Sequence, residues 1–399
     1  MLGMSGSGKA ALCKWGRAVV LFSGLSGLCA SASANTTDPG MVSQTLGEPA
    51  LSVSSVPPLP RIALLLPLRS ESLGRAADAV RDGFMAAYER DRDGTTVTVF
   101  ETGDSTQDAL SGYAEAAASN DIVVGPLSRT DVTAIALSRA INKPTIALTQ
   151  PDISAESEGA LPRQLLVVAL SIEDEARQVA MWAGAGKKSP RALVVSTTTA
   201  WQRRAGKAFA AQWRQQGAES QNLELVASGG YFSASGLAML KKRVQTEKPT
   251  LLFLALDAAQ ARQIRAAVGN DVVLYGTSQL NPFVPQDRDV SEHDIGMDGV
   301  RLLDLPWQIQ LEHPAVMIYP RAEVATDQKR SADLERLYAL GIDAYRIARE
   351  ISIHRHSFDI DGVSGKLHIG FGDEAAHFKR TLLPAVFQNG LVVPFSPSP

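Results

Sequence analysis

The chain has 399 residues, of which 45% are hydrophobic and 20% are charged, and its formal net charge is −3. This composition is typical of a globular protein, and without a basic excess nucleic acid is not expected as a main partner. The two cysteines, Cys13 and Cys29, both lie near the start of the chain. A disulfide framework or a cysteine-ligated metal site is therefore excluded from the rest of the sequence.

The first 34 residues have the pattern of an export signal. Basic residues precede an apolar stretch over 18–28, and the small residues at 30–34 fit the small-x-small rule for cleavage. We expect a Sec-type signal peptide over 1–34, cut near Ala34, which would send the protein to the periplasm. No other apolar run is long enough to span a bilayer, so no transmembrane helix is expected in the mature chain.

Cys29 offers an alternative, because an acylated cysteine at this place would make the protein an outer-membrane lipoprotein. Lipoprotein signals favour a large aliphatic residue three positions before the cysteine and a small one directly before it. Here Ser26 and Leu28 occupy those places in the reverse sense. Cleavage near Ala34 is thus the preferred prediction, with lipidation at Cys29 as the alternative.

Residues 35–60 are rich in proline, serine and threonine and show no apolar periodicity, which is typical of a linker. A regular alternation of apolar runs and amphipathic segments begins at Arg61. Runs bounded by turn signals predict buried strands, and apolar residues at intervals of three and four predict helices. The first series contains strands at 62–66, 97–100, 122–125 and 145–148, with helices at about 72–92, 107–118 and 130–141.

A second series has the same organisation. Its strands are predicted at 192–195, 223–226, 251–255 and 272–275, and its helices at about 201–216, 236–245 and 258–268. A strand at 165–168 and a helix at about 173–185 lie between the two series. The remaining segment is less regular, with a strand at 299–303, a helix at 334–347 and short strands at 367–371 and 391–393.

Strands that alternate with helices predict an α/β fold with parallel sheets covered on both faces. Two such series in tandem predict two doubly wound lobes, one over about 61–160 and one over about 161–295. Residues 296–399 are expected to return through the hinge to both lobes. Ligands of such sheets bind beyond the carboxyl ends of the strands.

Small polar residues follow several predicted strands and are the candidates for a ligand cleft. Hydroxyls, amides and helix N-termini at this edge can hold a carboxylate or a polar solute, although serine and threonine also favour such positions as helix caps. Arg129 is the expected partner of an anion, because guanidinium pairs bidentately with carboxylates. The candidate cleft residues are Ser128, Arg129, Thr149, Gln150, Thr197, Thr198 and Thr277.

Motifs that carry catalysis were not found. The sequence contains neither a Gly-x-Ser-x-Gly elbow nor a zincin motif, and the mature chain has no nucleophilic cysteine. The acidic residues at 173–175 fall in the first turn of a predicted helix, where the helix dipole favours them. We therefore expect a protein that is not an enzyme and that has no catalytic residues, cofactor or metal site.

Several segments resemble, in order, the C-terminal domain of the LpoA/LppC family of penicillin-binding protein activators. The resemblance covers about 61–395, and its main segments are 61–68, 79–84, 123–127, 174–178, 261–264, 275–278, 304–307 and 337–346. It implies a two-lobed type I periplasmic-binding-protein (Venus-flytrap) fold, with two doubly wound parallel sheets joined by hinge crossovers. In the larger members a long helical-repeat domain stands where this chain has residues 35–60.

The resemblance implies a non-catalytic regulator at the outer membrane, which stimulates a class A penicillin-binding protein in peptidoglycan synthesis. An alternative that the fold and the cleft residues leave open is a periplasmic solute-binding protein for an amino acid or another small polar ligand. Trp307 is expected to fill the core of the hinge rather than to stack on a ligand.

Overall fold

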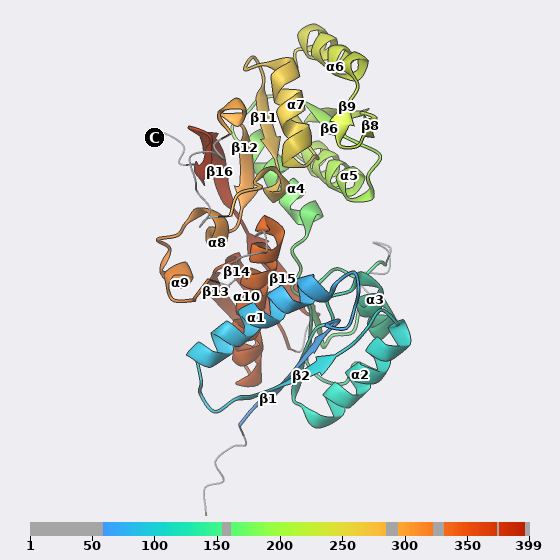
Figure 1. Cartoon of the computed structure of the whole chain (residues 1–399), viewed down its shortest axis with the longest axis vertical. Coiled ribbons are helices and arrows are strands. Elements are labelled where there is room, and N and C mark those ends of the chain that lie inside the picture. Colours follow the sequence, from blue (N-terminus) through green and yellow to red (C-terminus); the bar gives the residue numbers. More distant parts are fainter. Residues whose placement is uncertain (1–58, 154–160, 285–293, 322–330, 373–374, 396–399) are drawn as a thin grey trace, which may run out of the picture. The chain divides into compact units, whose positions relative to one another are not determined.

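Two open α/β sheets organise the part of the chain described by the computed structural model, which comprises residues 59–153, 161–284, 294–321, 331–372 and 375–395 (Figure 1). The predicted signal peptide, Cys29 and all but the last two residues of the predicted linker lie outside these ranges. No helix in the described ranges is long and apolar enough to cross a membrane.

The first sheet has five parallel strands in the order β2-β1-β3-β4-β5. Its last strand lies at 165–167, so the first lobe extends past residue 160, where we expected it to end. The reason is that β5 hydrogen-bonds to β4 before the chain leaves the sheet. The elements of this lobe are β1 (Arg61–Leu66), α1 (Gly74–Arg90), β2 (Thr96–Glu101), α2 (Thr106–Ser119), β3 (Ile122–Val124), α3 (Arg129–Leu137), β4 (Thr145–Ala147) and β5 (Leu165–Val167).

The side chains of β1 show why an uninterrupted apolar run forms the centre of this sheet. Successive residues of a strand point to opposite faces. Ile62, Leu64 and Leu66 therefore pack with α1 and the C-terminal helix α10 (Ala332–Ser352), whereas Ala63 and Leu65 pack with α2 and α3. A strand covered by helices on both faces buries every one of these side chains.

The second sheet has seven strands in the order β17-β16-β12-β11-β10-β6-β7. The five strands from β12 to β7 are parallel, and β16 and β17 add an antiparallel edge. The α/β two-lobed class is thus confirmed, with a mixed second sheet. Its elements are α4 (Ile172–Gly184), β6 (Arg191–Ser196), α5 (Ala200–Gln215), β7 (Glu219–Glu224), α6 (Ala234–Glu247), β10 (Leu251–Leu254), α7 (Ala258–Val268), β11 (Val273–Gly276), β12 (Arg301–Asp304), β16 (Leu383–Gln388) and β17 (Leu391–Pro394).

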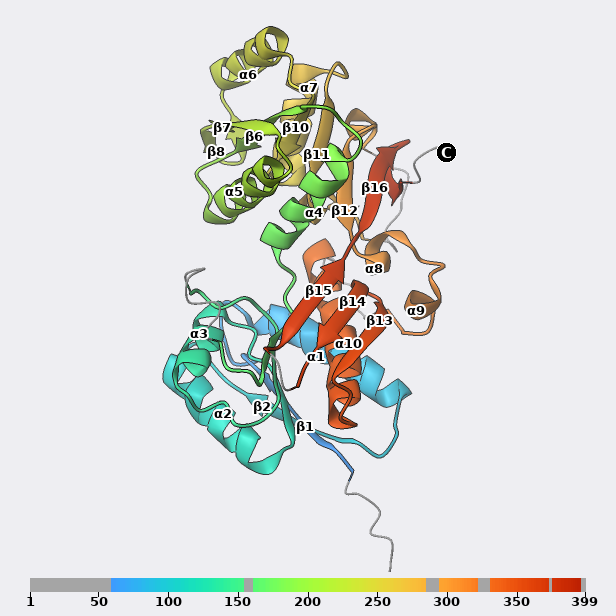
Figure 2. The same cartoon turned by 180° about the vertical axis from the view of Figure 1, so that it is seen from behind.

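Three segments connect the two lobes. The chain passes from β5 to α4, from β12 to the short helix α8 (Pro306–Ile309), and from β15 (His377–Thr381) through Leu382 to β16. Between the last two segments lie α10 and a three-stranded antiparallel sheet of β13 (Ser357–Gly362), β14 (Gly365–Gly370) and β15 (Figure 2). The minor elements are β8 (Ala227–Ser228), β9 (Tyr231–Phe232), η2 (Ser278–Leu280), η4 (Ile295–Met297) and α9 (Pro314–Met317).

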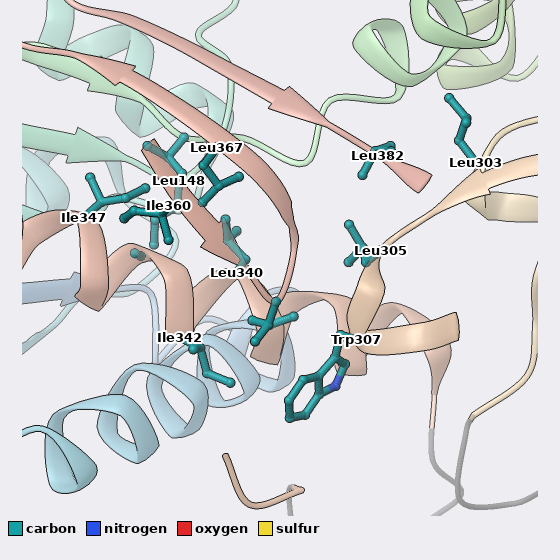
Figure 3. Packing of buried hydrophobic residues seen from close by; sticks show 14 of the residues in the cluster. Leu148, Leu303, Leu305, Trp307, Leu340, Ile342, Ile347, Ile360, Leu367 and Leu382 are labelled. Atoms are coloured by element: carbon teal, nitrogen blue, oxygen red, sulfur yellow. The ribbon is translucent and has the colours of Figure 1, made fainter. Parts of the chain in front are cut away.

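Buried apolar side chains continue from the first lobe into these connections. Leu340 of α10, Leu367 of β14 and Leu382 belong to one core cluster with Leu305 and Trp307 at the start of α8 (Figure 3). Trp307 is fully buried, as predicted. The apolar core of the first lobe therefore extends to the hinge.

Helices α1 and α10 pack at backbone contact through two glycines. A Cβ added to Gly83 would lie 1.9 Å from the carbonyl oxygen of Tyr338, and one added to Gly341 would lie 2.1 Å from that of Val80. Only a residue without a side chain fits at either position. The resulting close approach fixes α10 on the first lobe.

We expect Gly83→Ala to lower the free energy of unfolding by about 1–3 kcal/mol, because the added methyl group has to push two backbones apart. Gly74→Ala, on the same helix, is the control, since its Cβ would lie at an ordinary 3.4 Å from Leu68 O. Urea unfolding followed by circular dichroism would measure both variants. Equal stability of the two variants would contradict this explanation of the helix packing.

Candidate functional site

The candidate residues of the first lobe lie at the starts and ends of its regular elements. Ser128 caps α3, where its Oγ accepts a hydrogen bond from Asp131 N at 3.4 Å. Arg129 is the first residue of that helix, and Thr149 and Gln150 follow β4; all three are half-buried. Capping, the alternative considered for these polar residues, therefore describes Ser128, whereas the side chains of Arg129 and Gln150 line a cavity.

The candidate residues of the second lobe have different environments. Thr197 is buried and donates a hydrogen bond of 2.6 Å to Gln202, whose amide reaches Gln260 at 2.7 Å. Thr277 is fully buried, and its hydroxyl has no hydrogen-bond partner among the described residues. Thr198 is exposed. The Thr197 network lies within the second lobe, where it joins the loop after β6 to α5 and α7.

Arg129 and Gln150 line the same cavity, which has a volume of about 510 Å³ and which we call the α4 cavity. Its walls come from the loop after β4, from β5, from the first turns of α4 and from the start of β15. Besides Arg129 and Gln150 they include Asp152, Leu165, Val167, Ser171, Glu173, Asp174, Arg177 and Phe378. Its size is that of pockets that hold small molecules.

A smaller cavity of about 200 Å³ shares Ser171, Asp174, Arg177 and Phe378 with the α4 cavity. Arg380 lines it, and burial lowers the pKa of this guanidinium to about 10. Its Nε donates to Ser364 Oγ at 3.2 Å and its Nη1 to Ala169 O, while Nη2 has no partner among the described residues. The first turns of α4 thus border both cavities.

A buried charge cluster holds α10 to the second lobe. Arg336 of α10 is 5% exposed and reaches Asp304, at the end of β12, through Nε at 3.1 Å and Nη2 at 3.0 Å. The same Nη2 donates to the carbonyl oxygens of Ser278 and Asn281, both at 2.9 Å. Since α10 packs on α1, this one side chain links the first lobe to η2 and β12 of the second.

Glu175 of α4 completes the cluster. The carboxylate is 7% exposed and accepts a hydrogen bond of 2.9 Å from Ser278 N. Burial raises the pKa of Glu175 to about 7, against the opposing effect of the Ser278 donor. Burial alone would lower the pKa of Arg336, but the adjacent Asp304 raises it above its ordinary value. Arg336 and Asp304 therefore form an ion pair, with Glu175 beside it.

Sequence reasoning missed this cluster. Glu175 was expected only to favour the dipole of a helix's first turn, Asp304 was quoted only within the family segment 304–307, and Arg336 fell only within the helix predicted at 334–347. The available signal was charge within an apolar run: Asp304 within 302–307, and the adjacent Glu335 and Arg336 within 334–340. The described residues contain no group of three or more His, Cys, Asp or Glu side chains that could hold a metal ion.

Comparison with known proteins defines the family. The family model described as "LppC putative lipoprotein" matches residues 50–390. The chain belongs to the LppC family. Relatives of this LppC protein include the penicillin-binding protein activator LpoA of Photobacterium profundum, 27% identical over 86% of this chain and 58% of that protein, and the LpoA of Vibrio cholerae, 27% identical over 77% and 54%. This chain therefore spans little more than half the length of these curated relatives.

Solved structures confirm the type I periplasmic-binding-protein fold. The LpoA C-domain of Haemophilus influenzae, described as a regulator of PBP1A, aligns with a TM-score of 0.65 at 23% identity over 84% of this chain and 100% of that chain. A protein from Chromobacterium violaceum, described as a "putative branched-chain amino acid ABC transporter", aligns with a TM-score of 0.63 at 34% identity over 82% and 99%. The LppC chain therefore shares its fold with a protein described as a regulator and with one described as a transporter.

Proposed function

We propose that this LppC protein is a non-catalytic regulator that stimulates a class A penicillin-binding protein in peptidoglycan synthesis. The observation that carries the proposal is the match to LpoA, whose C-domain aligns along its whole length with this chain. The relatives that match by sequence are likewise named penicillin-binding protein activators. Regulators of this kind act by contact, which is consistent with a sequence that lacks the motifs of nucleophilic or metal-assisted catalysis.

The test is a transpeptidase assay with a purified class A synthase from the same organism, with and without the mature protein. We expect faster cross-linking when the protein is present, together with its retention on the immobilised synthase. The H. influenzae LpoA C-domain with its own PBP1A serves as the positive control. If neither binding nor a change in rate is found while the control responds, the proposal is wrong.

The proposed place of action is the periplasm. The export signal over 1–34 and the alternative acylation of Cys29 both deliver the protein there, the second as an outer-membrane lipoprotein. The family description as a lipoprotein favours testing both. Mass spectrometry of the mature N-terminus distinguishes a chain that begins at Asn35 from one that begins at an acylated Cys29.

A second function, the binding of a small polar solute, is favoured by one specific observation. Arg129 and Gln150 line the α4 cavity, in a fold that is shared at 34% identity with the protein described as a "putative branched-chain amino acid ABC transporter". A thermal-shift screen against metabolites tests it, since a ligand that binds only the folded protein raises its melting temperature.

A further inference from the structure

A single hydroxyl holds one basic and one acidic residue together at the α4 cavity. Thr133 Oγ1 donates a hydrogen bond of 2.8 Å to the carbonyl oxygen of Arg129 and accepts one of 2.8 Å from Asp152 N. Both Arg129 and Asp152 line the cavity. Their backbones are therefore fixed side by side, one on the first turn of α3 and the other in the loop after β4.

Neither of these two charges is neutralised by another side chain in the part of the chain that the structure describes. Among the described residues, the guanidinium of Arg129 and the carboxylate of Asp152 form no ion pair, with each other or with any other side chain. A free cation and a free anion at one cavity can receive a ligand that carries both opposite charges.

The charges on the opposite wall are already neutralised in pairs. On α4, Glu173 accepts a hydrogen bond of 2.6 Å from Arg204, and Asp174 pairs with Arg177. Ser171 is occupied as well, because its Oγ caps α4 by accepting from Asp174 N at 3.1 Å. The first turn of α4 therefore offers little net charge to a ligand. Arg129 and Asp152 are the side chains that can bind the charged groups of a ligand.

The remaining wall is apolar. Leu165 and Val167 of β5 and Phe378 of β15 line the same cavity, and the amide of Gln150 adds a neutral hydrogen-bonding group. A ligand that satisfies the whole cavity has a carboxylate, an ammonium group and a hydrocarbon side chain. Such a set of groups belongs to an apolar α-amino acid.

We infer that the α4 cavity binds an apolar α-amino acid, with Arg129 pairing with its carboxylate, Asp152 with its ammonium group, and Leu165, Val167 and Phe378 covering its side chain. Charge-assisted hydrogen bonds of this kind are the strong ones, and guanidinium binds carboxylate through two parallel bonds. The inference rests on the second proposed function, solute binding, and is independent of any action on a synthase.

Isothermal titration calorimetry with three probes that share one hydrocarbon chain separates the two charges. L-leucine has both charged groups, isopentylamine lacks the carboxylate, and 4-methylpentanoate lacks the ammonium group. We expect the wild-type protein to bind L-leucine about 10- to 100-fold more tightly than either analogue, which is the range for loss of a hydrogen bond to a charged group.

Substitutions then assign each group to its residue. Arg129→Gln should weaken L-leucine about 10- to 100-fold and leave isopentylamine unchanged, whereas Asp152→Asn should weaken L-leucine and leave 4-methylpentanoate unchanged. Arg139→Gln removes an exposed arginine of the same lobe that does not line the cavity, and it should bind like the wild type. Circular dichroism spectra and melting temperatures establish that each variant is folded.

The outcomes separate this inference from the function on which it rests. If Arg129→Gln and Asp152→Asn bind L-leucine as tightly as the wild type, the assignment of the site is wrong although solute binding stands. If the wild type binds no apolar amino acid but responds to another metabolite, the inference fails and solute binding again stands. If it binds no solute at all, both are wrong, and the synthase assay is unaffected by either result.

Discussion

Replacement of Arg336 by methionine should lower the free energy of unfolding by about 3–5 kcal/mol, which is the cost of leaving one partner of a buried ion pair uncompensated. The carboxylate of Asp304 is 0% exposed and would lose two hydrogen bonds from the guanidinium. The carbonyl oxygens of Ser278 and Asn281 would lose a donor as well. Methionine keeps the length and the apolar contacts of the stem, so the change mainly removes charge and hydrogen bonds.

Arg349→Met provides a matched control on the same helix. Arg349 also pairs with an aspartate, through Nε and Asp93 Oδ2 at 2.6 Å, but its side chain is 38% exposed and that of Asp93 is 31% exposed. Solvent weakens such pairs, so the expected loss is at most about 1 kcal/mol. Urea unfolding of both variants decides the point, and equal losses would show that burial of the Arg336 cluster adds nothing.

Arg336 also bears on how the two lobes are linked. The core around Trp307 and Leu382 is continuous with the first lobe, but apolar contacts have no preferred direction. The guanidinium of Arg336, with acceptors on β12 and beside η2, specifies a geometry. If Arg336→Met unfolds in two steps where the wild type unfolds in one, this side chain couples the lobes.

The central strands were predictable from the sequence because their apolar residues match their burial in the fold. The run 62–66 is covered by helices on both faces, so every residue is apolar and the strand is visible without knowledge of the fold. The strand predicted at 223–226 is instead β7 at 219–224. It is an edge strand that pairs only with β6, and its residues are mostly exposed and polar.

Other strands were missed for different reasons. In β13 buried and exposed residues alternate, so Phe358 and Ile360 are separated by Asp359 and no continuous apolar run forms. In β16 the second residue is Pro384, and proline is uncommon in a strand that pairs on both sides, as β16 does with β12 and β17. Both strands pair antiparallel with their neighbours. The prediction depended on repeated strand–helix units, which form parallel sheets, and these two strands belong to no such unit.

The candidate site could be predicted only on the first lobe. Polar residues after β3 and β4 follow from the rule for carboxyl ends of strands, which selected Arg129 and Gln150. Asp152 lies two residues further along and was not selected. The opposite wall comes from α4 and β15, which approach this point only because the chain crosses between lobes, and no local pattern encodes that approach.

Glu175 shows the same limit for a single residue. Three consecutive carboxylates, 173–175, occupy the first turn of α4, and each is an equally good partner for the helix dipole. Successive helical residues point in directions about 100° apart. Glu175 faces η2 and is buried, whereas Asp174 is exposed. Which of the three is buried depends on how α4 packs, and this is set by residues distant in sequence.

The buried carboxyl of Glu175 should make the stability of the protein depend on pH. Its folded-state pKa of about 7 lies above the ordinary value of 4.5, so between these pH values the folded protein binds more protons than the unfolded chain. The free energy of unfolding therefore falls as the pH rises through this window, by about 3 kcal/mol in total. Below pH 4.5 the neutral carboxyl is present in both states and the contribution is complete.

Glu175→Gln removes this dependence while keeping an oxygen that can accept from Ser278 N. We expect the variant to gain stability relative to the wild type as the pH rises from 4.5 to 7, by about 3 kcal/mol, and to change no further above that window. Glu115→Gln, at an exposed position on α2, is the control, because it makes the same change of side chain at a site that is not buried. Urea midpoints measured across this range provide the comparison.

Arg336 connects this prediction to the first. Its positive charge lowers the pKa of Glu175, in opposition to burial, so Arg336→Met should raise that pKa further. The pH-dependent loss of stability should then extend above pH 7 in the Arg336→Met protein and disappear again when Glu175→Gln is added. If the pH range over which stability is lost is the same in Arg336→Met as in the wild type, the guanidinium of Arg336 and the carboxyl of Glu175 do not interact. The cluster would then consist of two separate pairs.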